Sequence, residues 1–330
     1  MEIRIGIIGC GALGRIHAER FSAIDGVSVT ALADPNRSAL DFVASELSQR
    51  PETLTRDYRE LLDSGLDAVC IATPDSLHVP QLLDALAAGC HVLCEKPLTL
   101  EPGDLEAVIA SRDEVGKVVA LTYPRRYDRG IQRMREEILS GRWGVVKTVT
   151  AFNCEDWITP NRGSWRHDPE LCPGGFFYDA SGHQLDTLFW STGLAGTEVS
   201  ARMDNRGTPV PIVTTGTAVL TGGVPFTFSF IGDAHKWREH CTIHCETGDF
   251  VLEDGRAYWI QNGEFVPLQS DPLEESGDEA FIRLIRGAGL NWSPLEDVWP
   301  VLHFTRAALD SSKEGVPVPV VQNPGTKVPV

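Results

Sequence analysis

The residues best suited to exchange a proton lie between positions 174 and 190. Asp179 and His183 are four residues apart, so a continuous helix would bring their side chains together. Histidine exchanges protons with hydroxyl groups near neutral pH, and a neighbouring carboxylate would orient it. Asp186 falls on the same helical face, opposite the apolar one. The same pattern describes an amphipathic helix with a solvated polar face, and periodicity alone favours that interpretation.

A second candidate is a lysine that follows a short apolar strand. Lys96 comes directly after residues 91–94 and Glu95. It would lie at the carboxyl edge of a parallel sheet, where ligands of open α/β sheets bind. An ammonium group there could polarise a substrate oxygen or orient a cofactor amide. A solvated lysine on a surface loop is the alternative, and the following Pro97 allows a cis bond.

A glycine-rich turn near the N-terminus is typical of dinucleotide binding. Gly9-Cys10-Gly11-Ala12-Leu13-Gly14 follows an apolar run at residues 3–8 and opens a helical pattern. The glycines would permit a tight turn, close approach of a pyrophosphate and close helix packing. The positive end of the helix would offset the phosphate charge. Ala12 and Leu13 lie in this turn and are expected to contribute to the site.

An acidic residue lies where the ribose of such a cofactor would bind. Asp34 ends the second apolar run, 20 residues after Gly14. A carboxylate there would accept hydrogen bonds from the ribose and repel a 2′-phosphate, which favours NAD. Arg37 could pair with a 2′-phosphate, so NADP stays open as the alternative.

Strands and helices, which must position these residues, alternate in the first half of the chain. Non-alternating apolar strands followed by helices indicate a parallel sheet covered on both faces. The expected strands are residues 3–8, 26–33, 66–72, 91–94 and 117–122, and the expected helices are 11–24, 36–49, 76–88 and 102–113. The prediction is a doubly wound Rossmann domain.

The second half of the chain has a different pattern. A strand is expected at 145–153 and a helix at 176–190, and further strands with hairpin-type turns follow. The later strands are expected at 213–220, 225–231, 240–245, 250–253 and 257–261, and closing helices at 278–286 and 295–311. This pattern predicts an α/β domain with an open antiparallel sheet. We place the dinucleotide-binding domain at 1–123 and a substrate-binding and oligomerisation domain at 124–330.

Composition excludes several classes of function. The chain has 330 residues, 46 acidic and 29 basic, so its formal net charge is −17. That balance argues against binding nucleic acid or an anionic membrane. No apolar run approaches a membrane span and no secretory signal is visible. The eight cysteines are expected to be reduced core residues of a cytoplasmic protein.

Two groups of residues invite a metal interpretation that we do not adopt. His240-Cys241-Thr242-Ile243-His244-Cys245 reads as a strand, where His240 and His244 share one face and the cysteines the other. The four cannot converge on one ion without a bend. Asp179, His183 and Asp186 could also hold a metal. The sequence predicts no metal site.

The ordered set of motifs resembles the Gfo/Idh/MocA family of NAD(P)-dependent sugar and cyclitol oxidoreductases. The similarity runs across residues 3–190 and is looser in the sheet region that follows. The matching pieces are Gly9 to Gly14, Asp34-Pro35, Ala72-Thr73-Pro74 with His78, Gly89 to Pro97, and Gly174-Gly175 leading to Asp179 and His183. The Glu-Lys-Pro segment combined with the later Asp-x-x-x-His is the specific part.

The resemblance implies roles for individual residues. Lys96, Asp179 and His183 would be catalytic and would contact substrate. Thr73, Pro74, His78 and Glu95 would belong to the cofactor site, although Asp75 stands where family members often have Asn. Arg126, in the segment that links the domains, is a candidate substrate contact. Trp165, in the loop before the helix, could stack on a sugar or simply pack.

The implied reaction is hydride transfer between a nicotinamide cofactor and a secondary hydroxyl of a sugar, polyol or cyclitol. His183 would take the hydroxyl proton, Asp179 would orient the hydroxyl or His183, and Lys96 would stabilise the oxygen charge. The alternatives are a non-catalytic NAD(P)-binding sensor or regulator, and an NAD-dependent glycosidase. The family also implies a homodimer or homotetramer formed through the open sheet.

Overall fold

The computed structural model describes residues 2–268 and 275–321. The chain divides into two compact units, one from residues 1–122 and 275–296 and one from residues 123–274 and 297–330. The segment 275–296 therefore returns to the first unit, whereas the predicted domains place it in the second. It is held there because Asp278 bonds to His17 and Phe281 packs edge-on against Phe21.

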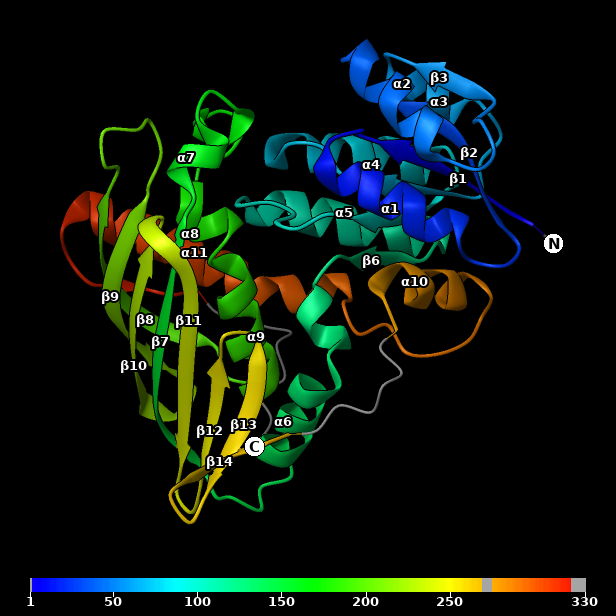
Figure 1. Cartoon of the computed structure of the whole chain (residues 1–330). Coiled ribbons are helices and arrows are strands. Elements are labelled where there is room, and N and C mark those ends of the chain that lie inside the picture. The colour runs from blue at the N-terminus through cyan, green and yellow to red at the C-terminus, as the bar shows by residue number, and fades with distance from the viewer. Residues whose placement is uncertain (1, 269–274, 322–330) are drawn as a thin grey trace. The chain divides into compact units, whose positions relative to one another are not determined.

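The first unit contains a six-stranded sheet in which every neighbouring pair is parallel (Figure 1). The strand order β3-β2-β1-β4-β5-β6 is that of a doubly wound dinucleotide-binding fold, so the predicted Rossmann class is confirmed. The strands are β1 (Ile3–Ile8), β2 (Val27–Ala33), β3 (Thr53–Thr55), β4 (Ala68–Ile71), β5 (His91–Cys94) and β6 (Val119–Leu121).

Helices alternate with these strands. They are α1 (Ala12–Ser22), α2 (Arg37–Glu46), α3 (Tyr58–Leu62), η1 (Asp75–Leu77), α4 (His78–Ala87), α5 (Pro102–Val115) and the late helix α10 (Gly277–Ile285). The short elements β3 and α3 lie in a stretch for which the sequence predicts no element. All four residues of β4 are buried, which explains its continuous apolar run.

The second unit contains a nine-stranded sheet of order β14-β13-β12-β11-β7-β10-β9-β8-β15. The expected all-antiparallel sheet is wrong in one respect, because β7 and β10 pair in parallel and the sheet is mixed. A parallel pair needs a crossover, and helices and two strands separate β7 from β10 in the chain. The strands are β7 (Val146–Asp156), β8 (Gly196–Asp204), β9 (Val213–Leu220), β10 (Val224–Ile231), β11 (Asp233–Cys245), β12 (Asp249–Glu253), β13 (Arg256–Gln261), β14 (Glu264–Pro267) and β15 (Val318–Pro319).

Helices of the second unit pack on one face of this sheet. Phe226, Phe228 and Phe230 alternate along β10 with exposed or partly exposed residues. Phe177 stacks on this row and Phe304 packs against it in tilted and edge-on contacts, which places the core between the helices and the sheet. The helices of this unit are η2 (Pro124–Tyr127), α6 (Arg129–Leu139), α7 (Ile158–Asn161), η3 (Trp165–His167), α8 (Gly175–Asp179), α9 (Gly182–Thr192), η4 (Thr221–Gly223) and α11 (Trp299–Glu314), and η5 (Leu295–Val298) spans the boundary between the two units.

The predicted helix 176–190 is two helices, α8 and α9. The amides of Ala180 and Ser181 both donate to the carbonyl of Phe176, at 3.1 and 3.0 Å. A bond from residue 181 to residue 176 spans five residues, which is the π-type pattern that inserts an extra residue into a helix. Asp179 and His183 therefore do not occupy neighbouring positions on one regular helical face.

Candidate functional site

The glycine turn joins the end of β1 to the start of α1. Gly9 has a φ of +93°, and a Cβ there would lie 2.6 Å from the carbonyl oxygen of Ala72. A Cβ on Gly14 would overlap the carbonyl oxygen of Gly9. A Cβ on Gly11 would meet no atom within 4 Å, so the fold itself does not require glycine there.

The N-terminus of α1 fits an anionic group. Gly11 is its N-cap and, among the described residues, no side chain caps the helix. Gly11, Ala12 and Leu13 are exposed, so amide groups of the first turn face open space. Open space at Gly11 beside these amides and the positive helix end fits the pyrophosphate of a dinucleotide.

Asp34 lies beside this turn. Its Oδ2 accepts the Cys10 amide at 2.7 Å and its Oδ1 accepts the Asn36 amide at 2.7 Å. The carboxylate is thereby fixed at the end of β2, where the sequence predicts it. Arg37 instead forms a two-point ion pair with Asp41 one turn along α2. That pair is exposed and therefore weak.

The side chain of His78, which the sequence predicts to belong to the cofactor site, is completely buried. Nδ1 lies 2.7 Å from the Pro97 carbonyl oxygen and Nε2 lies 2.8 Å from that of Thr73. Burial lowers the pKa of His78. The ring therefore ties the loop after β4 to the loop after β5, and Thr73 also donates to Gln81 at 2.6 Å.

Lys96 follows β5, and its backbone is held by two acceptors. Its amide lies 3.2 Å from both Glu95 Oε2 and Thr122 Oγ1. The Lys96–Pro97 bond is cis. Glu95 is itself buried, and its Oε1 bonds at 3.0 Å to His17 of α1. Sequence reasoning missed His17, although its place one turn after Gly14 on the glycine-turn helix is visible in the sequence.

Asp179 is buried at the end of α8, and its Oδ2 accepts a hydrogen bond from Arg166 Nε at 2.7 Å. The guanidinium of Arg166 in turn lies over the Trp165 ring, 4.3 Å from the ring centre. One face of Trp165 is therefore occupied by a cation. Sequence reasoning did not anticipate the Arg166–Asp179 pair.

His183 differs from the rest of α9 in its exposure. Every other residue of Gly182–Thr192 is buried, whereas His183 is partly exposed. The expectation of a solvated polar face is thus wrong, since Asp186 is buried on the same helix. A single accessible imidazole on a buried helix is the arrangement that proton exchange with a bound hydroxyl requires.

The side chain of Arg126, which the sequence predicts as a substrate contact, is bound by two carboxylates of its own unit. Its side chain is 1% exposed and binds Asp186 through two nitrogens, at 3.0 and 2.5 Å. A third nitrogen lies 2.6 Å from Asp297. The arginine ties η2 to α9, so it fixes the helix that presents His183. The neighbouring Arg125 pairs with buried Glu239 at 2.7 Å.

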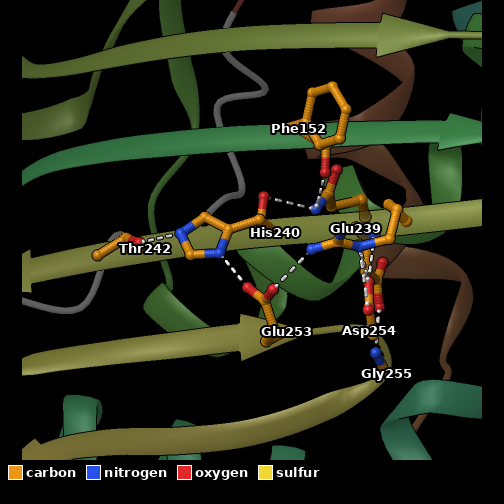
Figure 2. A network of polar contacts seen from close by, with 9 residues as sticks. Phe152, Glu239, His240, Thr242, Glu253, Asp254 and Gly255 are labelled. Carbon is orange, nitrogen blue, oxygen red and sulfur yellow. Dashed lines mark hydrogen bonds and ion pairs between the residues drawn. The ribbon is translucent and has the colours of Figure 1, made fainter. Parts of the chain in front are cut away.

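A polar network fixes α9 on the central strands of the sheet, and Figure 2 labels Phe152, Glu239, His240 and Gly255 among its members. Gln184 Nε2 donates to the carbonyls of Phe152 on β7, at 3.1 Å, and of His240 on β11, at 3.2 Å. Glu239 is fixed beside it, because its Oε1 accepts the Gly255 amide at 3.0 Å. His183 precedes Gln184, so this contact sets its position.

The strand around His240 does not form a metal cluster. His240 bonds to Glu253 and, at 2.7 Å, to Thr242, as Figure 2 shows, and His244 bonds to Asp249 at 2.9 Å. Cys241 and Cys245 are buried on the other face. Within residues 2–268 and 275–321 no group of three or more His, Cys, Asp or Glu side chains could hold a metal ion. All eight cysteines are buried and free. None of the helices in those ranges is long and apolar enough to span a bilayer.

Comparison with known proteins gives two family matches. A model described as "Oxidoreductase family, NAD-binding Rossmann fold" matches residues 3–123, and the model of the GFO/IDH/MocA C-terminal domain matches residues 131–251. Together they cover most of both units.

Individual relatives are more distant. The chain is 25% identical to inositol 2-dehydrogenase 4 of Saccharopolyspora erythraea over 98% of each chain. It is 34% identical to inositol 2-dehydrogenase of Cereibacter sphaeroides over 58% of this chain and 54% of that one. With several other relatives the aligned region likewise spans 54–58% of their length. The fold is similar to that of the WlbA dehydrogenase of Bordetella pertussis, solved with NADH and UDP-GlcNAcA, with a TM-score of 0.83, 22% identity and coverage of 98% and 100%.

Proposed function

Because the chain belongs to the Gfo/Idh/MocA family of oxidoreductases, we propose that it moves a hydride between a nicotinamide cofactor and a secondary hydroxyl of a sugar, polyol or cyclitol. Relatives named as inositol dehydrogenases support this substrate class. The single observation that carries the proposal is the exposure of His183 alone on the otherwise buried helix α9.

Each catalytic residue has a proposed task. His183 accepts the hydroxyl proton, and its access to solvent allows the proton to leave. Asp179 orients the hydroxyl or His183, and its own carboxylate is fixed by Arg166. The ammonium group of Lys96 stabilises the negative charge that develops on the substrate oxygen. The hydrogen bonds from its backbone amide to Glu95 and Thr122 hold the residue in place. A bound nicotinamide supplies the hydride acceptor or donor.

We propose NAD as the cofactor, with NADP as the weaker ligand. The pyrophosphate would bind the amides at the start of α1, and the ribose hydroxyls would donate to Asp34. A carboxylate fixed by the Cys10 and Asn36 amides repels a 2′-phosphate. NADH should bind at least about tenfold more tightly than NADPH, about 1.4 kcal/mol. Fluorescence titration measures both, and tighter NADPH binding would contradict the assignment.

We also propose that the protein is a homo-oligomer formed through the second sheet. On β9 and β10 the face opposite the phenylalanine row presents Thr215, Thr217 and Thr227, which are exposed. These short side chains suit a flat contact with a second copy. Light scattering coupled to gel filtration should give a dimer or tetramer, and a monomer at micromolar concentration would contradict the proposal.

The test of the reaction is NADH formation from a panel of inositols, polyols, aldoses and glucosides. A free polyol or sugar should raise the absorbance of NADH at a rate proportional to enzyme. Cleavage of a glycoside without net NADH would instead indicate the glycosidase alternative. Tight NADH binding with no turnover on any compound would indicate a sensor.

A further inference from the structure

A chain of buried polar contacts runs from α10 to the turn that carries Lys96. Asp278 Oδ1 lies 2.5 Å from His17 Nδ1, and His17 Nε2 lies 3.0 Å from Glu95 Oε1. The other Glu95 oxygen lies 3.2 Å from the Lys96 amide. The three side chains come from positions far apart in the sequence but all belong to the first unit.

These groups are almost entirely removed from water. Asp278 is 1% exposed, His17 5% and Glu95 7%. Burial opposes the charge on His17, but the hydrogen bonds to Asp278 and Glu95 outweigh it and raise the pKa of His17 to about 9. Burial would also raise the pKa of Glu95, yet the bond to His17 holds that pKa below its usual value. An imidazolium between two carboxylates results.

Other charged groups face this chain. Arg20 of α1 lies 3.3 Å from the second Asp278 oxygen, and its side chain is about half exposed. The Lys96 charge acts on Glu95, and the thiols of Cys70 and Cys94 lie near the carboxylates and stay protonated because burial raises their pKa. His17 is thus the group that bonds to both buried carboxylates.

We propose that His17 is a positioning residue that fixes Lys96 by clamping Glu95 against Asp278 of α10. The inference deepens the proposed function, since it assigns the support of a proposed catalytic lysine. One Glu95 oxygen bonds to His17 and the other to the Lys96 amide, and the Thr122 side chain also hydrogen-bonds to this carboxylate. Without the imidazole, Glu95 loses the partner that joins it to Asp278, which weakens its hold on the Lys96 amide.

The direct test measures amide exchange at Lys96 in the full chain. In the His17→Gln variant, hydrogen–deuterium exchange of the peptide that contains Glu95 and Lys96 should be at least tenfold faster than in wild type. His91→Gln is the matched control, because His91 lies on the same strand β5 and accepts the Val118 amide at 2.9 Å. The control should leave exchange at Lys96 within twofold of wild type.

A kinetic cycle separates positioning from general loss of structure. His17→Gln should lower kcat about tenfold, with the Kd of NADH within twofold of wild type. In a Lys96→Met background the same His17 change should alter kcat less than twofold, because the residue it positions is gone. If His17→Gln does not fold, Asp278→Asn weakens the same clamp and should change exchange and kcat in the same direction.

Two results would overturn the inference. Unchanged exchange at Lys96 in the His17 and Asp278 variants would mean that the clamp does not hold the turn. An equal loss of kcat in both Lys96 backgrounds would mean that His17 acts elsewhere. The exchange measurement needs no substrate, so it decides the inference even if no sugar or polyol is turned over and the proposed function fails.

Discussion

Gly11 and Gly14, in the turn between β1 and α1, are glycine for different reasons. Gly14 is required by the packing of α1 on the turn, because a Cβ would overlap the Gly9 carbonyl oxygen. Gly11 has an extended backbone, with φ −72° and ψ −165°, that alanine can adopt, and a Cβ there would meet nothing within 4 Å. We therefore propose that position 11 is glycine because a ligand approaches the backbone there.

This difference gives a matched pair of variants. Gly11→Ala should leave the unfolding midpoint in urea nearly unchanged and weaken NADH binding by about tenfold or more, because the methyl group enters the pyrophosphate site. Gly14→Ala should lower the free energy of unfolding by roughly 1–3 kcal/mol, because the added methyl overpacks the turn. Gly11→Ala with unchanged NADH affinity would contradict the assignment of the site.

The accessible imidazole of α9 is the residue on which the proposed chemistry depends. His183→Ala should lower kcat by about 10²–10⁴-fold, the range that general acid–base groups supply. NADH affinity should stay within about twofold, because the cofactor contacts assigned to the first unit are untouched. Steady-state kinetics and fluorescence titration measure both quantities. Equal loss of turnover and NADH binding would mean that the residue has a structural role.

At the scale of elements, the Arg126–Asp186 pair joins η2 to α9. Both groups are buried, so Arg126→Met leaves an uncompensated carboxylate and should lower the free energy of unfolding by about 3–5 kcal/mol. Arg129→Met is the control, because Arg129 is exposed and donates a hydrogen bond to the side chain of Gln132, so a change within about 0.5 kcal/mol is expected. A stable Arg126→Met protein with only a raised KM would instead support a substrate contact.

Local patterns predict the elements of the first unit well and the region around α9 less well. Apolar runs ended by Gly9, Asp34 and Lys96 predict β1, β2 and β5, because strands buried on both faces must be apolar. The π-type bond between Ser181 and Phe176 leaves no such pattern, so the helical wheel of 176–190 is misleading. Helix α6 is not among the helices predicted from the sequence, although the pattern for it is present. Asp128 caps it, and Ile131, Met134 and Ile138 follow at helical spacing.

Contacts between distant segments limit prediction at the scale of the whole chain. The return of residues 275–296 to the first unit depends on Asp278 and Phe281, which no local pattern links to His17 and Phe21. The parallel pairing of β7 with β10 likewise joins strands that are separated in the chain by the helices α7, α8 and α9 and by two other strands. The two-domain α/β class was predictable, because strand type and turn residues change between the two halves.

The protonation of His17 predicts how stability depends on pH. The folded state raises the pKa of His17 to about 9, from an unfolded value near 6.5. The protonated His17 therefore stabilises the folded state by about 3 kcal/mol. This stabilisation is fully present below about pH 6.5 and is lost as pH rises through 9. Urea unfolding at pH 6, 8 and 10 should show a steeper alkaline loss in wild type than in His17→Gln. Parallel pH profiles would contradict a charged His17.

The origin of the transferred hydrogen tests the proposed reaction most directly. A sugar or cyclitol that is turned over should be supplied with deuterium on the reacting carbinol carbon, and the reduced cofactor analysed by mass spectrometry. Hydride transfer predicts one deuterium per reduced nicotinamide, bound at C4, together with a slower rate than for the unlabelled compound. Deuterium released to water, or product formed with no reduced cofactor, would contradict the account.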